Sequence, residues 1–143
     1  MIVSTKGRYA LRVMIDLAEH QMDGYIPLKE IAERQDISEK YLEAIIKTLV
    51  RAKLLLGLRG KGGGYQLSRE PEQYTAGEIV RVAEGGLASV ACLMSDAEIC
   101  SRAANCKTLP MWKKLDRLVN DFLDSYTLAS LMNVKQTGDD YVI

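Results

Sequence analysis

The sequence is poor in the residues from which most active sites are built. It has a single histidine, His20, and no nucleophile with a recognisable base and orienting acid. His20 ends a predicted helix, where a histidine more often interacts with the helix dipole than acts as a general base. The N-terminal segment also lacks an apolar run long enough for a secretion signal or a membrane span. These shortages predict a non-enzymatic, cytoplasmic protein with no membrane partner.

Cysteine is scarce too, and all of it lies in one stretch that contains Cys92, Cys100 and Cys106. Cytoplasmic thiols stay reduced, so clustered cysteines there bind metal or sense redox state more often than they form structural disulfides. Seven residues separate the first pair and five the second, which is looser than the CxxC spacing of structural zinc sites. The spacing therefore favours an iron–sulfur cluster over zinc, while three ordinary cysteines are the alternative.

A net charge of zero hides an uneven distribution of charge. Residues 40–69 contain seven basic residues and a single acid, Glu43, whereas the residues from 70 onward contain seven bases and eleven acids. A basic stripe of this kind suits a polyanion such as nucleic acid, although a solvated surface can have the same composition.

Apolar residues recur at helical spacing in three segments of the first third of the chain. They predict helices over residues 4–21, 27–34 and 38–52, with Ser38 as the cap of the third. The second and third helices are joined by residues 35–37, and the third is basic on its outer side. This pattern predicts a helix-turn-helix unit.

After the third predicted helix, the helical spacing of apolar residues ends. LLLGLRGKGGGYQLS predicts a β-hairpin wing, and Thr75 with Glu78 predicts a capping box that opens a helix to Glu84. A helix from Pro110 carries a broad apolar stripe, and a further short helix ends near Met132. The stripe either packs within the chain or forms a dimer arm, which we favour because the winged domain has little surface left to cover it.

The predicted fold is mainly α with a small β-hairpin. It comprises a winged helix-turn-helix DNA-binding domain over residues 1–86 and a cysteine loop, the cluster-binding segment, over residues 87–109. A dimerisation helix and a short final helix follow over residues 110–135, and residues 136–143 form a flexible tail.

The helix-turn-helix and the wing supply the candidate DNA-binding residues. The start of the third helix could reach base edges in the major groove, where Glu43 would accept from cytosine N4. Arg59 could enter a narrow minor groove, and Lys61 could follow the backbone. Basic residues of the first helix, together with the amides that open the helices at Ser4 and Pro27, could hold phosphates. The full set is Lys6, Arg8, Ser38, Lys40, Tyr41, Glu43, Arg59 and Lys61.

The glycine-rich segment GLRGKGGGY is not a nucleotide-binding P-loop, because it lacks the required spacing and the Ser or Thr after lysine. Taken together, four segments instead resemble the IscR-type winged-helix regulators, whose relatives include NsrR and CymR. These segments are STKGRYALRVMIDLA, LKEIAERQDISEKYLEAIIKTLVRAKLL, RGKGGGYQLSREPEQYTAGEIVRVAEG and C-x7-C-x5-CKTLPMW. The resemblance covers residues 1 to about 133.

The resemblance implies a homodimeric bacterial transcription factor, often a repressor, that binds a palindromic operator in double-stranded DNA. It also implies a long dimerisation helix and, in many members, an iron–sulfur cluster. By position, the three cysteines match the cluster ligands, Glu43 matches a base-reading residue and Arg59 matches a wing residue.

Some positions depart from the family pattern. The histidine that follows the third cysteine by three residues in the cluster-assembly regulator is Leu109 here, and the acid of the nitric-oxide branch is Arg8. The spacing between the first two cysteines is also longer than usual. The fourth ligand is therefore open among Asp96, Glu98, Ser101, Asn105 and a small molecule. The cysteine-metabolism branch lacks the cysteine trio, which disfavours close equivalence to it.

The sequence leads to the hypothesis of an iron–sulfur-dependent transcriptional repressor that senses cluster status or redox or nitrosative stress. A 2Fe–2S cluster is favoured over 4Fe–4S. Two alternatives stay open: a cluster-free DNA-binding regulator that responds through thiols or a partner, and a zinc-stabilised protein-interaction module.

Overall fold

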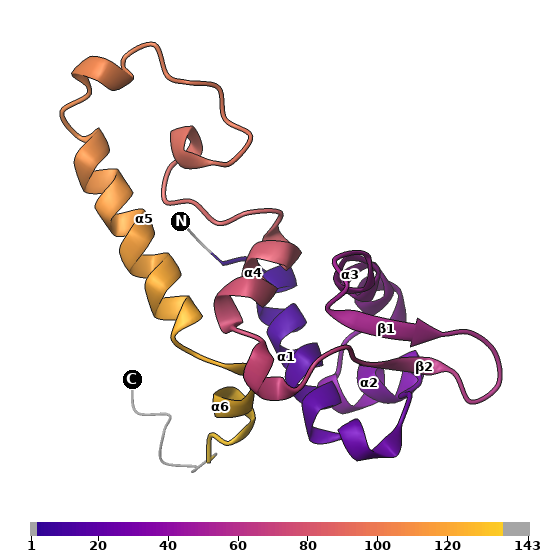
Figure 1. Ribbon diagram of the computed structural model, residues 1–143. Coiled ribbons are helices and arrows are strands. Elements are labelled where there is room, and N and C mark those ends of the chain that lie inside the picture. The colour runs from indigo at the N-terminus through magenta and orange to yellow at the C-terminus, as the bar shows by residue number, and fades with distance from the viewer. Residues whose placement is uncertain (1–2, 136–143) are drawn as a thin grey trace.

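The elements of the protein follow the predicted order, in a computed structural model that describes residues 3–135 (Figure 1). The mainly helical fold with one antiparallel hairpin is confirmed, whereas the predicted tail lies outside the described residues. The helices are α1 (Thr5–Glu19), α2 (Leu28–Gln35), α3 (Glu39–Arg51), α4 (Ala76–Glu84), α5 (Leu109–Asp124) and α6 (Leu128–Met132). The strands are β1 (Leu55–Leu58) and β2 (Gly64–Leu67), and 3-10 turns occupy Gln21–Asp23, Pro71–Gln73, Ala91–Leu93 and Ala103–Asn105.

The helix boundaries follow local capping. Ser38 Oγ accepts from the Tyr41 amide at 3.2 Å, and Thr75 Oγ1 accepts from the Glu78 amide at 3.1 Å, as predicted. The reciprocal half of the Thr75–Glu78 capping box is absent, because the Glu78 carboxylate binds Arg69 instead. Pro27 is the residue before α2 rather than its first residue. These differences shift boundaries by a residue or two and leave every predicted helix in place.

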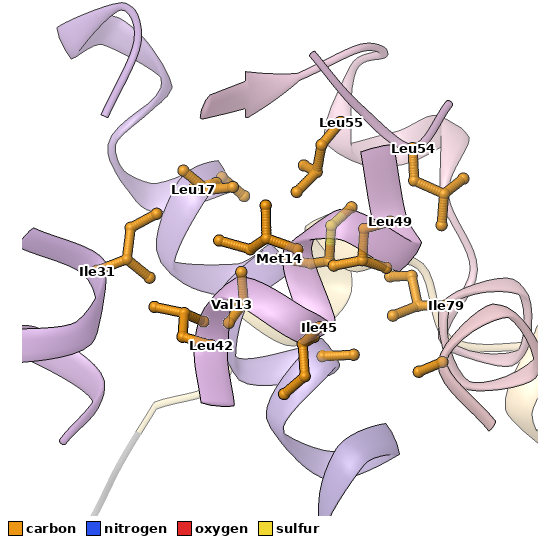
Figure 2. Close-up of a cluster of buried hydrophobic side chains, with 14 of the residues drawn as sticks. Val13, Met14, Leu17, Ile31, Leu42, Ile45, Leu49, Leu54, Leu55 and Ile79 are labelled. Atoms are coloured by element: carbon orange, nitrogen blue, oxygen red, sulfur yellow. The ribbon is translucent and has the colours of Figure 1, made fainter. Parts of the chain in front are cut away.

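The core is built around α1, which packs against α2, α3, α4 and α6. Figure 2 shows aliphatic side chains from α1, α2, α3, α4 and the start of the hairpin meeting in one cluster. Burial of these side chains removes apolar surface from water and stabilises the packing of the helices on one another. The labelled members are Val13, Met14, Leu17, Ile31, Leu42, Ile45, Leu49, Leu54, Leu55 and Ile79.

A buried carboxylate fixes α2 against α1. Asp16, only 1% exposed, accepts two hydrogen bonds from Arg34, at 2.7 and 2.9 Å, and one from Gln35 at 2.9 Å. The bidentate pair raises the pKa of Arg34 above its usual value. His20 Nδ1 lies 2.8 Å from the Asp16 carbonyl oxygen at the end of α1, consistent with its predicted role there. The network holds the helix-turn-helix unit on the rest of the domain.

The hairpin is held at its base by close backbone contacts. The backbones of Ile26 and Tyr65 exchange two hydrogen bonds, of 2.9 and 2.8 Å. Gly64 has a φ of +146°, and a Cβ at this position would overlap the Ile26 carbonyl oxygen. This position therefore requires glycine, because only glycine tolerates both the conformation and the contact.

The Tyr74 hydroxyl joins both ends of the hairpin, so we expect Tyr74→Phe to lower the free energy of unfolding. The buried hydroxyl donates to the Leu54 carbonyl at 2.8 Å and accepts from the amides of Ser68 and Arg69 at 2.9 and 3.0 Å. Its loss leaves these groups without that partner, at a cost on the order of 3 kcal/mol. Urea unfolding followed by circular dichroism measures the effect, and a change below about 0.5 kcal/mol would contradict this role.

The helix α5 lies beside α4, and none of its residues is buried (Figure 1). Its apolar stripe contains Met111, Leu115, Leu118 and Phe122, the last two each 60% exposed. These four residues of the predicted stripe are exposed, whereas Trp112, Val119 and Leu123 are half-buried, so the domain covers the stripe only in part. No helix within residues 3–135 combines the length and apolar character that crossing a bilayer requires.

Candidate nucleic-acid interface and cysteine loop

The outer side of α3 and the hairpin form one basic surface. Lys47 and Arg51 of α3 and Arg59 of the hairpin line a cleft of about 380 Å³ between the two elements. Apolar atoms of Ile46, Val50 and Tyr65 line the same cleft. Cations from two elements therefore face one concave surface, an arrangement that suits the phosphates of a nucleic acid.

The hairpin tip exposes Arg59 and Lys61. Gly60 and Gly62 turn the chain with φ angles of +92° and +75°, which glycine adopts without strain. Neither Arg59 nor Lys61 has a side-chain hydrogen bond or ion pair within residues 3–135. Both side chains can therefore reach a ligand without breaking an internal contact.

At the start of α3, Lys40, Tyr41 and Glu43 are exposed. Glu43 forms an ion pair with Lys47 one turn later, at 3.3 Å, and both side chains are more than half exposed. Such a pair adds little stability, so Glu43 can exchange Lys47 for a base amino group at low cost. Tyr41 packs edge-on against Tyr9 of α1, with ring centroids 5.8 Å apart. The contact fixes Tyr41 relative to the core.

The N-terminus of α1 differs from the prediction. Glu84 Oε1 accepts from the amides of Ser4 and Gly7, each at 3.0 Å, and from Ser4 Oγ at 2.7 Å. The prediction that the Ser4 amide holds a phosphate is therefore wrong, because a carboxylate of the chain occupies that position. Lys6 and Arg8 are exposed nearby, and Arg8 donates to Thr5 Oγ1 at 3.0 Å.

All three cysteines line one cavity of about 210 Å³ in the loop between α4 and α5. Cys92 and Cys100 are exposed, Cys106 is half-buried, and all three are free thiols. Glu98, Leu109 and Lys113 line the same cavity. Within residues 3–135, however, no three His, Cys, Asp or Glu side chains converge closely enough to hold a single metal ion. The thiols share a cavity without meeting at one point.

The cavity has the donor chemistry of an iron–sulfur site. Cysteine thiolates are the usual cluster ligands. Leu109, which stands where the sequence comparison with the cluster-assembly regulator placed a histidine, lines the cavity but offers no donor. Of the candidate fourth ligands, Glu98 lines this cavity, while Ser101 and Asn105 line a second one, of about 340 Å³, beside Cys106. Asp96 lines neither, so Glu98 is the best placed.

The environment of Cys106 lowers the pKa of its thiol, through the Thr108 hydroxyl at 3.5 Å and the amides of Thr108 and Leu109. A lowered pKa means that more thiolate is present at neutral pH. In metal-free protein we expect Thr108→Val to move the pH midpoint of Cys106 alkylation upward and to slow alkylation at pH 7. Mass spectrometry of iodoacetamide-treated protein measures the rate, and unchanged alkylation would refute the contact.

Comparison with known proteins decides the family. Residues 3–134 match the model of the Rrf2 family, described as an iron-dependent transcriptional regulator. The chain belongs to the Rrf2 family. Its members are transcriptional regulators rather than enzymes, which confirms the resemblance and the absence of catalytic function expected from the sequence. Of the alternatives left open by the sequence, the DNA-binding regulator fits this family.

Relatives from two branches of the Rrf2 family are similar to the chain. The HTH-type transcriptional regulator IscR of Aliivibrio salmonicida is 35% identical, with 97% of this chain and 83% of that protein covered. The structure of CymR, the global cysteine regulator of B. subtilis, has a TM-score of 0.75 and 38% identity over 95% of this chain and 99% of that one. T. potens IscR has a TM-score of 0.70 and 37% identity over 99% and 97%. Because the two structures are almost equally similar, overall likeness does not separate the branches.

Proposed function

We propose that the protein is an iron–sulfur-dependent repressor that binds a palindromic operator as a homodimer. The observation that carries the proposal is that Cys92, Cys100 and Cys106 all line one cavity, in a chain that also carries a basic helix-turn-helix and wing. The family description and the similarity to IscR proteins support it.

DNA is contacted in this proposal by two elements. The start of α3, from Ser38 to Glu43, enters the major groove, and Arg59 at the hairpin tip enters the adjacent minor groove. Lys61 neutralises a neighbouring phosphate, and Lys6 and Arg8 contact the backbone from α1. The exposure of these side chains supports the assignment.

The dimer forms through the apolar stripe of α5. Met111, Leu115, Leu118 and Phe122 are all at least 40% exposed along one side of the helix, a contiguous apolar surface that a second copy would cover. Two DNA-binding domains related by a two-fold axis fit a palindromic sequence, with their recognition helices about one DNA turn apart.

The three cysteines would hold the cluster, with Glu98 as the best-placed residue for the fourth position. A bound cluster supplies a redox-active group that is labile to oxidants. The segment that carries the thiols contains just two short 3-10 turns between α4 and α5. This segment can adapt to a ligand at little structural cost, and it is joined directly to the helix that forms the dimer.

The cluster assignment is tested by anaerobic purification. We expect brown protein that contains iron and acid-labile sulfide, and we expect Cys106→Ala to lose both. Lys107→Ala, an exposed neighbouring change outside the thiols and the candidate fourth ligands, serves as the matched control and should retain them. Colourless protein with stoichiometric zinc, or no metal after reconstitution, would contradict the assignment.

A cluster-free, thiol-responsive regulator is the second candidate. The similarity to CymR, the cysteine regulator, favours it, as do the accessible thiols in a loop without a converged metal site. Under this alternative, metal-free and reconstituted protein bind operator with equal affinity, and alkylation of the thiols alone changes that affinity.

A further inference from the structure

A cluster of polar side chains joins the dimer helix α5 to α4. Asp124 Oδ1 accepts from Arg81 Nη2 at 2.8 Å and from Thr75 Oγ1 at 3.1 Å, and Asn120 Oδ1 accepts from Arg81 Nη1 at 3.0 Å. We refer to Thr75, Arg81, Asn120 and Asp124 as the α4–α5 latch. Because Arg81 bridges two residues one turn apart on α5, the latch fixes both the distance and the rotation between the helices.

Gly77 shows how closely the two helices approach. A Cβ on Gly77 would overlap Asp124 Oδ1 and lie 2.9 Å from Arg81 Nη1, so it would meet both halves of the latch. The backbone of Gly77 is helical and buried, with no left-handed φ that would require glycine. The absence of a side chain therefore serves the contact between the helices rather than the conformation of α4.

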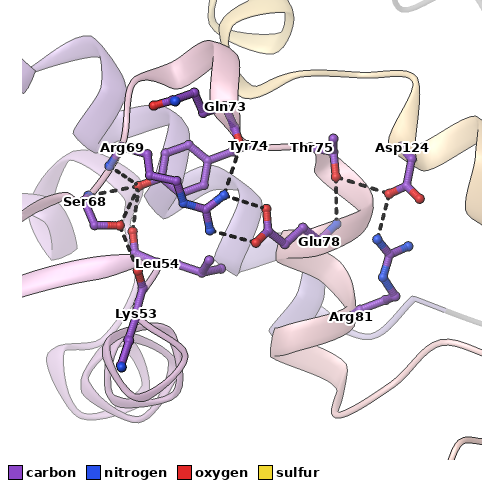
Figure 3. Close-up of polar contacts among 10 residues, drawn as sticks. All are labelled: Lys53, Leu54, Ser68, Arg69, Gln73, Tyr74, Thr75, Glu78, Arg81 and Asp124. Carbon is purple, nitrogen blue, oxygen red and sulfur yellow. Dashed lines mark hydrogen bonds and ion pairs between the residues drawn. The ribbon is translucent and has the colours of Figure 1, made fainter.

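The same helix α4 holds the wing on its other side. Glu78 forms a bidentate pair with Arg69, at 2.7 and 3.1 Å, and Arg69 directly follows the strand β2 and Ser68. Figure 3 shows this pair on one side of the first turns of α4, and three members of the latch, Thr75, Arg81 and Asp124, on the other. The direction of α5 is thus related to the direction of the wing through one short helix.

The cysteine loop is attached to the same assembly. The Ser89 amide donates to Asp116 Oδ1 at 2.8 Å, and Ser89 Oγ donates to the Trp112 carbonyl oxygen at 3.1 Å. Asn120 of the latch in turn donates to the Asp116 carbonyl oxygen at 2.8 Å. The segment three residues before Cys92 is therefore fixed to α5 one turn away from the latch.

From this geometry we infer that the α4–α5 latch sets the spacing between DNA half-sites that the dimer accepts. This inference rests on the proposed function, because it requires pairing through α5 and reading by α3 and the wing. A rigid connection between α5 and the DNA-binding elements, α3 and the wing, determines the distance and the relative rotation of the two DNA-binding domains in the dimer. Arg81 and Gly77 are accordingly positioning residues that contact no DNA.

The test measures spacing preference separately from DNA affinity. Duplexes are first selected from random DNA by the wild-type protein, and their spacer is then lengthened or shortened by one base pair. Each added base pair rotates a half-site by about 34°, so wild-type affinity should fall about tenfold or more, the order of cost of a mismatched base pair. A duplex with one half-site serves as the spacing-independent reference.

Two variants break the latch in different ways. Arg81→Ala removes the bridging guanidinium, and Gly77→Ala places a methyl group against it while favouring helix formation. We expect both variants to remain folded, which thermal unfolding checks, and we expect both to bind the single half-site normally. For both variants, the ratio of the affinity for the selected spacer to the affinity for the altered spacers should fall several-fold toward one. Asp121→Asn, an exposed change on α5 outside the latch, should keep the wild-type preference.

The outcomes are distinguishable. Unchanged spacer preference in both variants would overturn the latch inference while leaving the proposed function intact. An equal loss of affinity for every duplex, including the single half-site, would also overturn it, because that pattern indicates general destabilisation. Wild-type protein that selects no paired half-sites would contradict the proposed function, and the latch inference with it.

Discussion

Leu118→Asp is expected to convert the protein from a dimer to a monomer and to lower its affinity for a palindromic operator by about 10²–10⁴-fold, the usual gain from linking two binding sites. The Leu118 side chain is 60% exposed at the centre of the apolar stripe of α5. A carboxylate there would be buried without a partner in a paired interface but would remain in water in a monomer. Sedimentation equilibrium and DNA titration measure the two effects.

A matched change separates dimerisation from monomer stability. Arg117→Asp places the same side chain at the preceding position of α5, outside the stripe, and should leave the protein dimeric. Thermal unfolding of both variants checks that the fold is preserved, since exposed substitutions usually alter stability by about 0.5 kcal/mol or less. Leu118→Asp protein that sediments as a dimer would exclude α5 as the pairing surface.

Arg59→Ala is expected to cost about 1–3 kcal/mol of operator binding for each half-site, so about 2–6 kcal/mol for a dimer. Arg59 lies at the hairpin tip and lines the cleft between the wing and α3. Its loss should relax sequence preference at the bases beside the recognition helix. Titration of the selected operator and of variants changed at these bases measures the effect.

Lys61→Ala is the comparison for Arg59→Ala. A lysine that contacts only phosphate should weaken binding to all sequences alike, and its removal should reduce the slope of log affinity against log salt by about 0.9 for each phosphate that is no longer neutralised. Arg59→Ala protein that binds its operator as tightly as wild type would show that the wing does not read DNA. Glu43→Ala should instead relax preference at a single base pair, because a carboxylate accepts from cytosine N4.

The sequence predicted those parts of the fold that depend on local interactions. The caps at Ser38 and Thr75 are short-range hydrogen bonds, and the helical spacing of apolar residues reflects a face that each helix must bury. The hairpin followed from glycines that permit left-handed φ angles, at Gly60 and Gly62. Such features need no knowledge of distant residues.

The contacts that sequence reasoning missed join residues far apart in the chain. Arg34 reaches Asp16 across 18 residues, Arg81 reaches Asp124 across 43, and Glu84 reaches Ser4 across 80. Charged residues in helices normally face solvent, so their type and spacing gave no reason to pair them. The single signal in the sequence was the position of Asp16 among apolar residues of α1, which indicates burial and hence a need for a partner.

The candidate site also has a part that the sequence could predict and a part that it could not. The DNA-reading residues could be proposed because a helix-turn-helix has a fixed outer surface, and the structure exposes these side chains. The cysteine loop has little regular structure, so spacing alone could not show that all three thiols line one cavity or that Glu98 lines it as well. The latch was equally inaccessible, because it depends on how α5 folds back along α4.

In the proposed function, the state of the cysteine site controls DNA binding. The most direct measurement is operator affinity of one anaerobic preparation before and after reconstitution with iron and sulfide, together with the Cys106→Ala variant. We expect the reconstituted wild-type protein to differ in affinity from the metal-free form, and we expect the variant to show a single affinity under both conditions. Equal affinity of metal-free and fully reconstituted wild-type protein would contradict the claim.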